Sequence, residues 1–192
     1  MLVTRTFLQQ LAPADIVPAV VPEEPVEITR VEVPAPEFSR FLYATVGGAH
    51  YWTDRLDWSW QRWQDWVTQP GFESWVCWSG GAPAGYAELL GSPGEQGTEV
   101  ELAYFGLLPA FTGRGLGGHL LTTALRRAWS LSGRHPDFPP VSRVWLHTCT
   151  LDGERALPNY KARGLHPYRS EQYERELTLP TGPWPGAFPG GD

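Results

Sequence analysis

A glycine-rich turn between a predicted strand and a predicted helix constrains the fold of this chain more than any other feature. The turn, Gly113 to Gly118, has glycine at four of its six positions. An alternating apolar run, Thr98 to Leu108, precedes it, and an amphipathic stretch, Leu120 to Trp129, follows it. Glycine lets the backbone approach a ligand closely, and the first turn of a helix offers unpaired N–H groups to an anion. This order of elements predicts a phosphate-binding turn.

Three consecutive strands are predicted before the turn. The runs Glu73–Trp78 and Ala84–Leu90 flank a hairpin turn at Gly80-Gly81, and a second turn leads to the strand Thr98–Leu108. Consecutive strands joined by short turns pair antiparallel. The sequence therefore predicts an antiparallel meander that ends at the glycine turn.

Hydrophobic periodicity predicts the remaining elements of an α+β chain. They are strands over 26–33 and 141–149, helices over 37–46 and 60–68, a short helix over 152–163, and one or two closing strands over 165–179. Asp57 or Ser59 is expected to cap the helix over 60–68, and Asp152 the helix over 152–163. A short strand over Val3–Leu8 is also expected. The strand before the glycine turn, the helix after it and the strand over 141–149 form a βαβ crossover.

The length of 192 residues suits one domain with short extensions. We place that domain at residues 26–179. Residues 1–25 are expected to be an N-terminal extension with a proline-rich connector, outside the common core. Residues 180–192 are rich in proline and glycine and are expected to form a tail.

Charge and composition exclude several classes of function. The net charge of −6 argues against a nucleic-acid-binding protein, which usually has a basic balance. No apolar run approaches the roughly 20 residues that span a bilayer, and Met1 to Gln10 lacks the apolar core of a signal peptide. Cys77 and Cys149 each lie in an apolar run and are predicted to be buried free thiols. We therefore expect a cytoplasmic protein without membrane or nucleic-acid partners.

Two common phosphate-binding motifs explain the glycine turn poorly. Gly113-x-Gly115-x-x-Gly118 matches the dinucleotide fingerprint, but that motif follows the first strand of a chain with several later βα units. Here an antiparallel meander precedes the turn. A nucleotide P-loop needs Gly-Lys-Ser/Thr, which is absent.

The segment instead resembles motif A of the GNAT superfamily of acyl-CoA-dependent N-acyltransferases. That motif has a proline two residues after Leu or Val, and then Q/R-x-x-G-x-G/A at the start of a helix. Leu107-x-Pro109 and Thr112-x-x-Gly115-x-Gly117 align with it, and Thr112 replaces the usual Gln or Arg.

A second segment is similar to another motif of this family. Ala156, Tyr160 and Gly164 align with A-x-x-x-Y-x-x-x-G-F, and Leu165 stands where phenylalanine is usual. The resemblance covers residues 26 to about 177. It implies a mixed, mostly antiparallel central sheet of about six to seven strands with helices on both faces.

The resemblance implies that an acetyl group is moved from acetyl-CoA to a primary amine of a small molecule or peptide by direct attack in a ternary complex. The alternative is a non-catalytic acyl-CoA sensor or interaction module on the same fold. No metal is predicted, because His119, His135, His147 and His166 lack ligand spacing with a carboxylate or cysteine pair. The oligomeric state, including a homodimer, stays open.

The resemblance also implies where the acyl-CoA binds. Backbone N–H groups of Phe105 and Leu107 hold the thioester and pantetheine if the strand over 141–149 separates from them. Amides over 114–119 hold the pyrophosphate, and the side chains of Arg114 and Arg163 add charge. The implied cofactor-binding residues are Phe105, Leu107, Leu108, Thr112, Gly113, Arg114, Gly115, Leu116, Gly117, Gly118, His119 and Asp152.

Acetyl transfer to an amine requires a base that deprotonates the amine and a hydrogen-bond partner for the CoA sulfur. An amine with a pKa of about 10.4 costs roughly 4–5 kcal/mol to deprotonate at neutral pH, so a base within reach is useful. Glu101 matches the position of the general base in some members of the family. Glu88 on the preceding strand is a second candidate, and His50 and His147 are further ones. Tyr160 matches the tyrosine that faces the CoA sulfur.

The segment Phe38 to Trp66 is expected on the acceptor side of the cleft, because members of the family vary most there. The predicted substrate-binding residues are His50, Tyr51, Trp52 and Arg55. Four tryptophans also lie here: Trp58, Trp60, Trp63 and Trp66. They pack against a sheet or form an aromatic wall of the cleft. The segment's aromatic character and few charges favour an aromatic or apolar acceptor.

Overall fold

The computed structural model describes residues 1–177 of the 192. The predicted tail at 180–192 and the end of the predicted closing strand lie outside the described residues.

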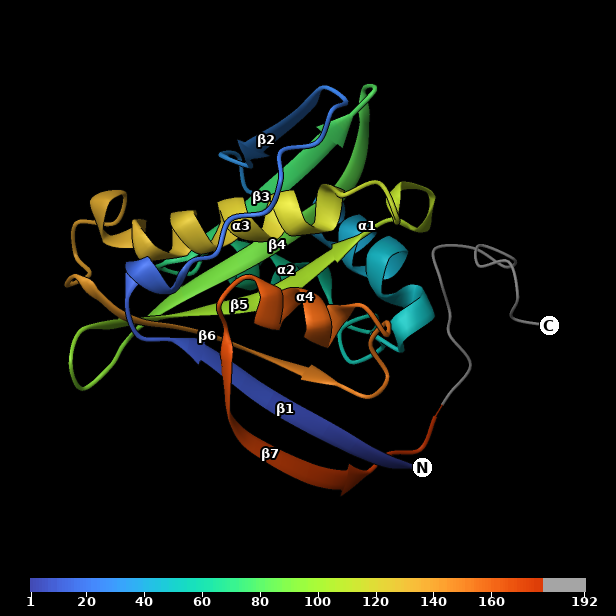
Figure 1. The fold of residues 1–192 in the computed structure, drawn as a ribbon. Coiled ribbons are helices and arrows are strands. Elements are labelled where there is room, and N and C mark those ends of the chain that lie inside the picture. Colours follow the sequence, from blue (N-terminus) through green and yellow to red (C-terminus); the bar gives the residue numbers. More distant parts are fainter. Residues whose placement is uncertain (178–192) are drawn as a thin grey trace.

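A seven-stranded sheet forms the centre of the described chain, in the order β2-β3-β4-β5-β6-β1-β7 (Figure 1). Every pairing in it is antiparallel except the one between β5 and β6, which is parallel. Its strands are β1 (Leu2–Gln10), β2 (Val26–Arg30), β3 (Phe72–Ser79), β4 (Ala82–Pro93), β5 (Thr98–Leu107), β6 (Val141–Cys149) and β7 (His166–Glu174). The predicted α+β class and the mostly antiparallel sheet are confirmed.

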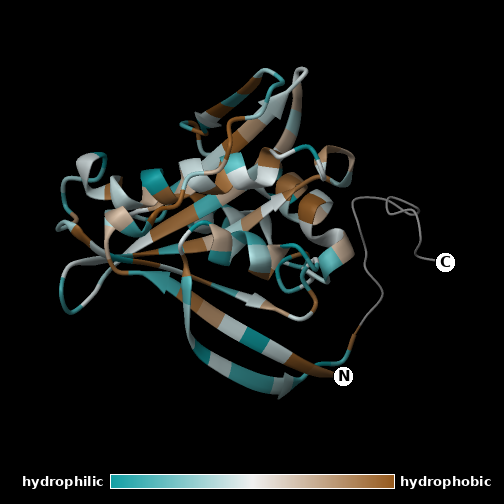
Figure 2. Ribbon diagram, in the orientation of Figure 1, coloured by the Kyte–Doolittle hydropathy of each residue, from teal (hydrophilic) through white to brown (hydrophobic). Residues whose placement is uncertain are grey.

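Helices cover both faces of the sheet, as predicted. They are α1 (Pro36–Gly47), α2 (Trp60–Thr68), α3 (Leu116–Trp129) and α4 (Ala156–Ala162). Leu42 and Val46 of α1 pack with Val76 of β3 and Tyr86 of β4 on one face. On the other face, α3 and α4 pack over the larger core cluster. Figure 2 shows hydrophobic residues along β4 and β5, and hydrophilic residues along the edge strand β7.

The helix after the glycine turn is held by its apolar stripe. The residues of this stripe are all buried: Leu116, Leu120, Leu121, Ala124, Leu125 and Ala128. Each fully buried leucine contributes about 1.5–3 kcal/mol relative to an exposed one. The stripe therefore fixes α3 on β4, β5 and β6, and places the N-terminus of the helix beside the end of β5.

The helix α2 begins at its predicted position, and Ser59 rather than Asp57 caps it. The Ser59 Oγ accepts a hydrogen bond from the Arg62 N–H at 3.2 Å. Trp63 of this helix is buried, whereas Trp60 is 56% exposed. Trp63 packs against Tyr43 of α1 and Trp58, whereas Trp66 packs against Phe72 of β3. Packing against the sheet therefore accounts for Trp66 but not for Trp60.

The N-terminal residues correct our expectation that residues 1–25 lie outside the core. β1 lies inside the sheet between β6 and β7, and Arg5 is opposite Cys149 on one side and Glu171 on the other. The following segment crosses α3, where the Ala19 N–H donates to the Thr122 hydroxyl at 2.9 Å. Both strand partners of β1 lie far along the chain, so no local pattern could reveal the pairing.

The helix α4 is shorter than predicted, and Asp152 does not cap it. Its N-cap position is Arg155. The Asp152 carboxylate instead accepts hydrogen bonds from the Cys149 N–H at 2.9 Å and from the Thr148 hydroxyl. These bonds close the turn after β6 and place Asp152 at the cleft between β5 and β6.

Candidate functional site

A cleft of about 470 Å³ opens where β5 and β6 separate. The last recorded pair between these strands is Glu101 with Trp145. On its other side, β5 pairs with β4, but the register shifts there: Glu88 faces Tyr104 while Leu89 faces Leu102. Ala103 is therefore the extra residue of a β-bulge, a feature that bends a strand. The bend comes just after β5 leaves β6, and it shapes the wall of the cleft.

The cleft-side edge of β5 presents backbone N–H groups. The Leu108 N–H donates to the Ala84 carbonyl at 2.9 Å, on the side of β4. Residues of an antiparallel pair point their N–H groups alternately toward and away from the partner strand. Phe105 and Leu107 are three and one residues before Leu108, so their N–H groups point away from β4, toward the space that β6 has left. Both residues line the cleft.

The glycine turn continues this edge. Gly113 and Gly115 have φ of 80° and 78°, in the left-handed region that favours glycine. The first helical hydrogen bond of α3 runs from the His119 N–H to the Gly115 carbonyl at 3.4 Å. The N–H groups of residues 116–118 therefore have no acceptor within the helix. Thr112, Gly113, Gly115, Gly117 and Gly118 line the cleft.

If the turn binds the acyl-CoA that the motif resemblance implies, replacing Gly115 with alanine is expected to weaken acetyl-CoA binding by about tenfold, because a left-handed alanine costs about 1–2 kcal/mol. The turn would relax from the geometry that aims its N–H groups at the cleft. Isothermal titration calorimetry with acetyl-CoA measures the effect. Gly133→Ala is the matched control, since its added Cβ meets no atom within 4 Å. An unchanged dissociation constant for Gly115→Ala would contradict a phosphate site at this turn.

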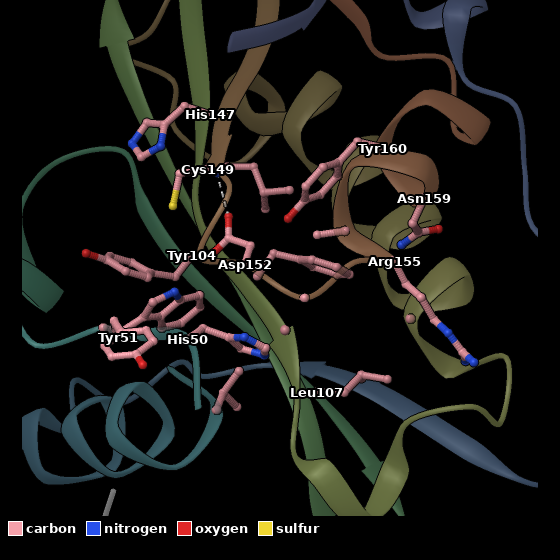
Figure 3. Close-up of a pocket in the computed structure, with 18 of the residues that line it drawn as sticks. His50, Tyr51, Tyr104, Leu107, His147, Cys149, Asp152, Arg155, Asn159 and Tyr160 are labelled. Carbon is pink, nitrogen blue, oxygen red and sulfur yellow. Dashed lines mark hydrogen bonds between the residues drawn. The ribbon is translucent and has the colours of Figure 1, made fainter. Parts of the chain in front are cut away.

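Tyr160 reaches the cleft from α4, close to Asp152 (Figure 3). Its ring lies edge-to-face against Phe105, with 5.9 Å between centroids, and the residue is 6% exposed. Burial, with the nearby charge of Asp152, raises the pKa of Tyr160 well above its ordinary value. The hydroxyl therefore stays protonated at neutral pH and can donate a hydrogen bond.

The other end of the cleft is walled by the loop after α1. The predicted residues His50, Tyr51 and Trp52 line it. Tyr51 has φ of 57°, which is uncommon for a bulky residue. The Trp52 ring lies 4.9 Å from the Tyr104 ring, centroid to centroid. Aromatic surface therefore dominates this end.

Arg55, predicted to bind substrate, lies behind that wall rather than in the cleft lining. Its guanidinium stacks 3.7 Å from the centroid of Trp66 and 4.4 Å from that of Tyr104. Cation–π contacts of this kind hold Arg55 beneath the aromatic wall.

The two candidate bases also lie behind the cleft lining. Glu101 is half-buried at the point where β5 leaves β6, and burial raises its pKa, which the charge of Arg55 partly opposes. Glu88 is 1% exposed and accepts a hydrogen bond from the Trp66 indole at 2.9 Å. Burial raises the pKa of Glu88 to about 7, against that hydrogen bond and the charge of Arg55.

Four predicted cofactor-binding residues are absent from the cleft lining: Leu108, Arg114, Leu116 and His119. Leu116 is wholly buried in the core. The Arg114 side chain turns away to pair with Glu24 and to bond the Ser79 hydroxyl at 3.3 Å. Only the backbone amides of Arg114, Leu116 and His119 thus belong to the turn.

Sequence reasoning missed several residues that line the cleft: Arg5, Arg155, Asn159, Tyr173 and Arg175. Arg155 and Asn159 directly precede Ala156 and Tyr160, so the second motif could have indicated them. A Cβ added to Gly113 would lie 3.9 Å from the Arg155 Nη1, which places this guanidinium at the glycine turn.

Within residues 1–177, no group of three or more His, Cys, Asp or Glu side chains is arranged to hold a metal ion. None of the described helices is long and apolar enough to cross a membrane.

Solved structures with this fold include two bacterial GCN5-related N-acetyltransferases. The one from Kribbella flavida is 20% identical, with a TM-score of 0.58 over 87% of this chain and 55% of that chain. The one from Sphaerobacter thermophilus is 17% identical, with a TM-score of 0.53 over 88% and 50%. The chain thus spans about half the length of both.

A third similar structure is an aminoglycoside acetyltransferase from an uncultured soil metagenomic sample, solved with sisomicin. It is 13% identical, with a TM-score of 0.52 over 72% of this chain and 85% of that one. Identities this low show the fold alone. No curated protein matches the chain. The family model for the acetyltransferase (GNAT) family, however, matches residues 39–165, which is well over half of the sequence. The chain therefore belongs to the GNAT family of acetyltransferases.

Proposed function

We propose that this protein transfers an acetyl group from acetyl-CoA to a primary amine of a small molecule or peptide, by direct attack in a ternary complex. One observation carries the proposal. The open N–H edge of β5 runs directly into the glycine turn and the N-terminus of α3, and Tyr160 lines the same cleft. Acetyl-CoA supplies the activated acetyl group when bound.

The residues present fit an acyl-CoA. The N–H groups of Phe105 and Leu107 are donors for the thioester and pantetheine carbonyl oxygens. Amides over 115–118 and the positive end of the α3 dipole suit the pyrophosphate. The Arg155 guanidinium adds positive charge beside the same turn.

Two side chains carry the proton chemistry in this proposal. Glu101, acting through water, accepts a proton from the amine, and its raised pKa makes the carboxylate a stronger base. The Tyr160 hydroxyl donates a hydrogen bond to the departing thiolate. Glu88 is the second candidate base, but Trp66 holds it in the fully buried interior.

Thermal unfolding with acetyl-CoA, longer acyl-CoAs and NAD tests the cofactor assignment. We expect a higher Tm with acetyl-CoA and no change with NAD, because ligands that bind only the folded state stabilise it. The response to longer acyl-CoAs reports the acyl-chain preference. Stabilisation by NAD without stabilisation by acetyl-CoA would overturn the proposal.

Replacing Tyr160 with phenylalanine is expected to lower kcat by about 10- to 100-fold, since a hydrogen bond to a charged group is worth about 1.5–3 kcal/mol. Acetyl-CoA affinity should stay nearly unchanged, because the ring and its contact with Phe105 remain. Tyr86→Phe is the matched control: Tyr86 is also a buried tyrosine, but it lies outside the cleft lining. Equal turnover by Tyr160→Phe and the native chain would contradict a hydrogen bond from the Tyr160 hydroxyl to the departing thiolate.

A further inference from the structure

The charged side chains of the cleft are distributed unevenly between its two ends. Among the described residues, five of them line it: Arg5, Asp54, Asp152, Arg155 and Arg175. Arg155 lies at the glycine turn, where the proposed function places phosphate. Asp152 lies beside Tyr160, where the proposed reaction occurs (Figure 3). Arg175, from just after β7, bonds the loop at the acceptor end, and Arg5 of β1 lies opposite Cys149 of β6.

Asp54 balances one of these two arginines. The Arg175 Nη2 donates to the Asp54 carboxylate at 3.0 Å and to the Tyr51 carbonyl at 3.0 Å. It also donates to the Thr53 hydroxyl at 3.3 Å. This neutral pair therefore fixes the loop that carries Tyr51 and Trp52, and it leaves no net charge at that wall.

Arg5 is not balanced in the same way. Its Nη1 donates to the Glu171 carboxylate at 3.1 Å, but Glu171 also pairs with Arg169. One carboxylate thus serves two guanidinium groups. The Arg5 Nε is buried and has no hydrogen-bond partner among the described residues. A net positive charge with unused donor capacity therefore remains at the acceptor end, although the whole chain is acidic.

The position of Arg5 suits ligand binding in the cleft. It lies opposite Cys149 in the register of β1 and β6, and Cys149 lines the cleft near Asp152. The guanidinium stacks on Tyr173, 4.8 Å from the ring centroid, and its side chain is 34% exposed. Stacking fixes the plane of the guanidinium, and a planar fork of donors matches a carboxylate.

We propose, building on the proposed acetyltransferase function, that the acceptor is an amine that also carries a carboxylate. The amine faces Asp152 and Tyr160, the carboxylate pairs with Arg5, and an aromatic or apolar body fills the space between them. Tyr51, Trp52, Tyr104 and Tyr173 line that space. A polyamine would instead place like charge against Arg5, which selects against it.

Two matched pairs of amines test this proposal: L-tyrosine with tyramine, and 4-(aminomethyl)benzoate with benzylamine. Members of a pair differ only in the carboxylate, which adjoins the amine in the first pair and lies across the ring in the second. We expect kcat/KM at saturating acetyl-CoA to favour the carboxylate in at least one pair by about tenfold or more. Spermidine should be acetylated least efficiently.

Three variants assign the preference to Arg5. Arg5→Gln should reduce it to about twofold or less, and Arg5→Lys should retain a substantial part, since a charge remains. Arg169→Gln is the matched control, because Arg169 pairs with the same Glu171 from outside the cleft lining. It should reduce the preference less than Arg5→Gln does, because it leaves Glu171 to Arg5 alone but keeps the Arg5 guanidinium in the cleft. Equal efficiency within both pairs, or equal effects of Arg5→Gln and Arg169→Gln, would overturn the proposal.

Binding separates failure of this proposal from failure of the proposed function. Benzoate binding to the CoA-saturated protein is measured by calorimetry, with benzyl alcohol as the uncharged probe. Benzoate binding that Arg5→Gln weakens by about tenfold supports the carboxylate site even if no amine is acetylated. Absence of benzoate binding overturns the site, whether or not the protein acetylates other amines.

Discussion

Replacing Glu101 with glutamine is expected to lower kcat by about 10²- to 10⁴-fold, the usual contribution of a positioned general base. Glu101 lies at the last pair between β5 and β6, two residues before the bulge at Ala103 that lines the cleft. Glutamine keeps the size of the side chain but cannot accept the proton. Acetyl-CoA affinity should therefore change little, and steady-state kinetics with calorimetry separate the two effects.

The pH dependence of turnover should also identify Glu101 as the general base. Burial raises the pKa of Glu101, so the basic carboxylate forms only above that raised value. Turnover by the native chain should fall as pH drops through this pKa, and Glu101→Gln should lack that acidic limb. Glu88→Gln is the matched comparison. If Glu88→Gln loses turnover and Glu101→Gln does not, the roles of the two carboxylates are reversed.

A second large effect is expected far from the cleft, at Glu73 of β3. Its carboxylate is buried and accepts hydrogen bonds from the Arg134 Nε at 2.7 Å and Nη2 at 2.8 Å. The Trp75 indole donates to it at 2.9 Å, and Arg30 and His135 lie within 3.4 Å and 3.1 Å. Burial opposes ionisation of Glu73, but these hydrogen bonds and charges together lower its pKa.

Replacing Glu73 with alanine is expected to destabilise the protein by about 3–5 kcal/mol, because removing one partner of a buried ion pair leaves the other uncompensated. Arg134 and Arg30 are partly exposed and can recover some hydration, which favours the lower end of that range. Urea unfolding of the native and variant chains measures the difference. A loss well below this range would mean that water already solvates the cluster.

The stability from Glu73 should depend on pH. A carboxylate with a lowered pKa in the folded state stabilises the protein above its unfolded pKa of about 4.3. That contribution is lost as pH falls through the folded pKa. The difference between native and Glu73→Ala chains should therefore shrink below about pH 4. Glu171→Gln, which removes a carboxylate shared by two more exposed arginines, should change stability little.

Local sequence patterns were enough for the elements that lead to the cleft. The observed bounds of α2 and β6 equal the predicted ones, because each is set by its own periodicity and flanking residues. The left-handed glycines of the turn could likewise be predicted, since few residues other than glycine adopt that conformation. These elements bring the glycine turn, Tyr160 and the aromatic loop to one cleft.

Features that depend on distant partners were not predictable from the sequence. The insertion of β1 between β6 and β7 is a pairing of remote strands, and it alone brings Arg5 to the cleft. The separation of β5 from β6 after Glu101 and the bulge at Ala103 that follows it are likewise marked by no residue pattern. For Arg114 the local motif predicted a contact that the structure does not show. Its place in the motif suggested a phosphate contact, but Glu24, far away in sequence, pairs with its side chain.

Acetyl transfer itself is tested most directly by amine-dependent release of CoA thiol from acetyl-CoA, with the N-acetylated product quantified by mass spectrometry. The amines are the two matched pairs, spermidine, sisomicin and a peptide with a free N-terminus. We predict thiol and N-acetylated product in equal amounts with at least one amine. Tight binding of acetyl-CoA without release of CoA thiol in the presence of any of these amines would contradict acetyltransferase activity. It would favour a non-catalytic acyl-CoA-binding module.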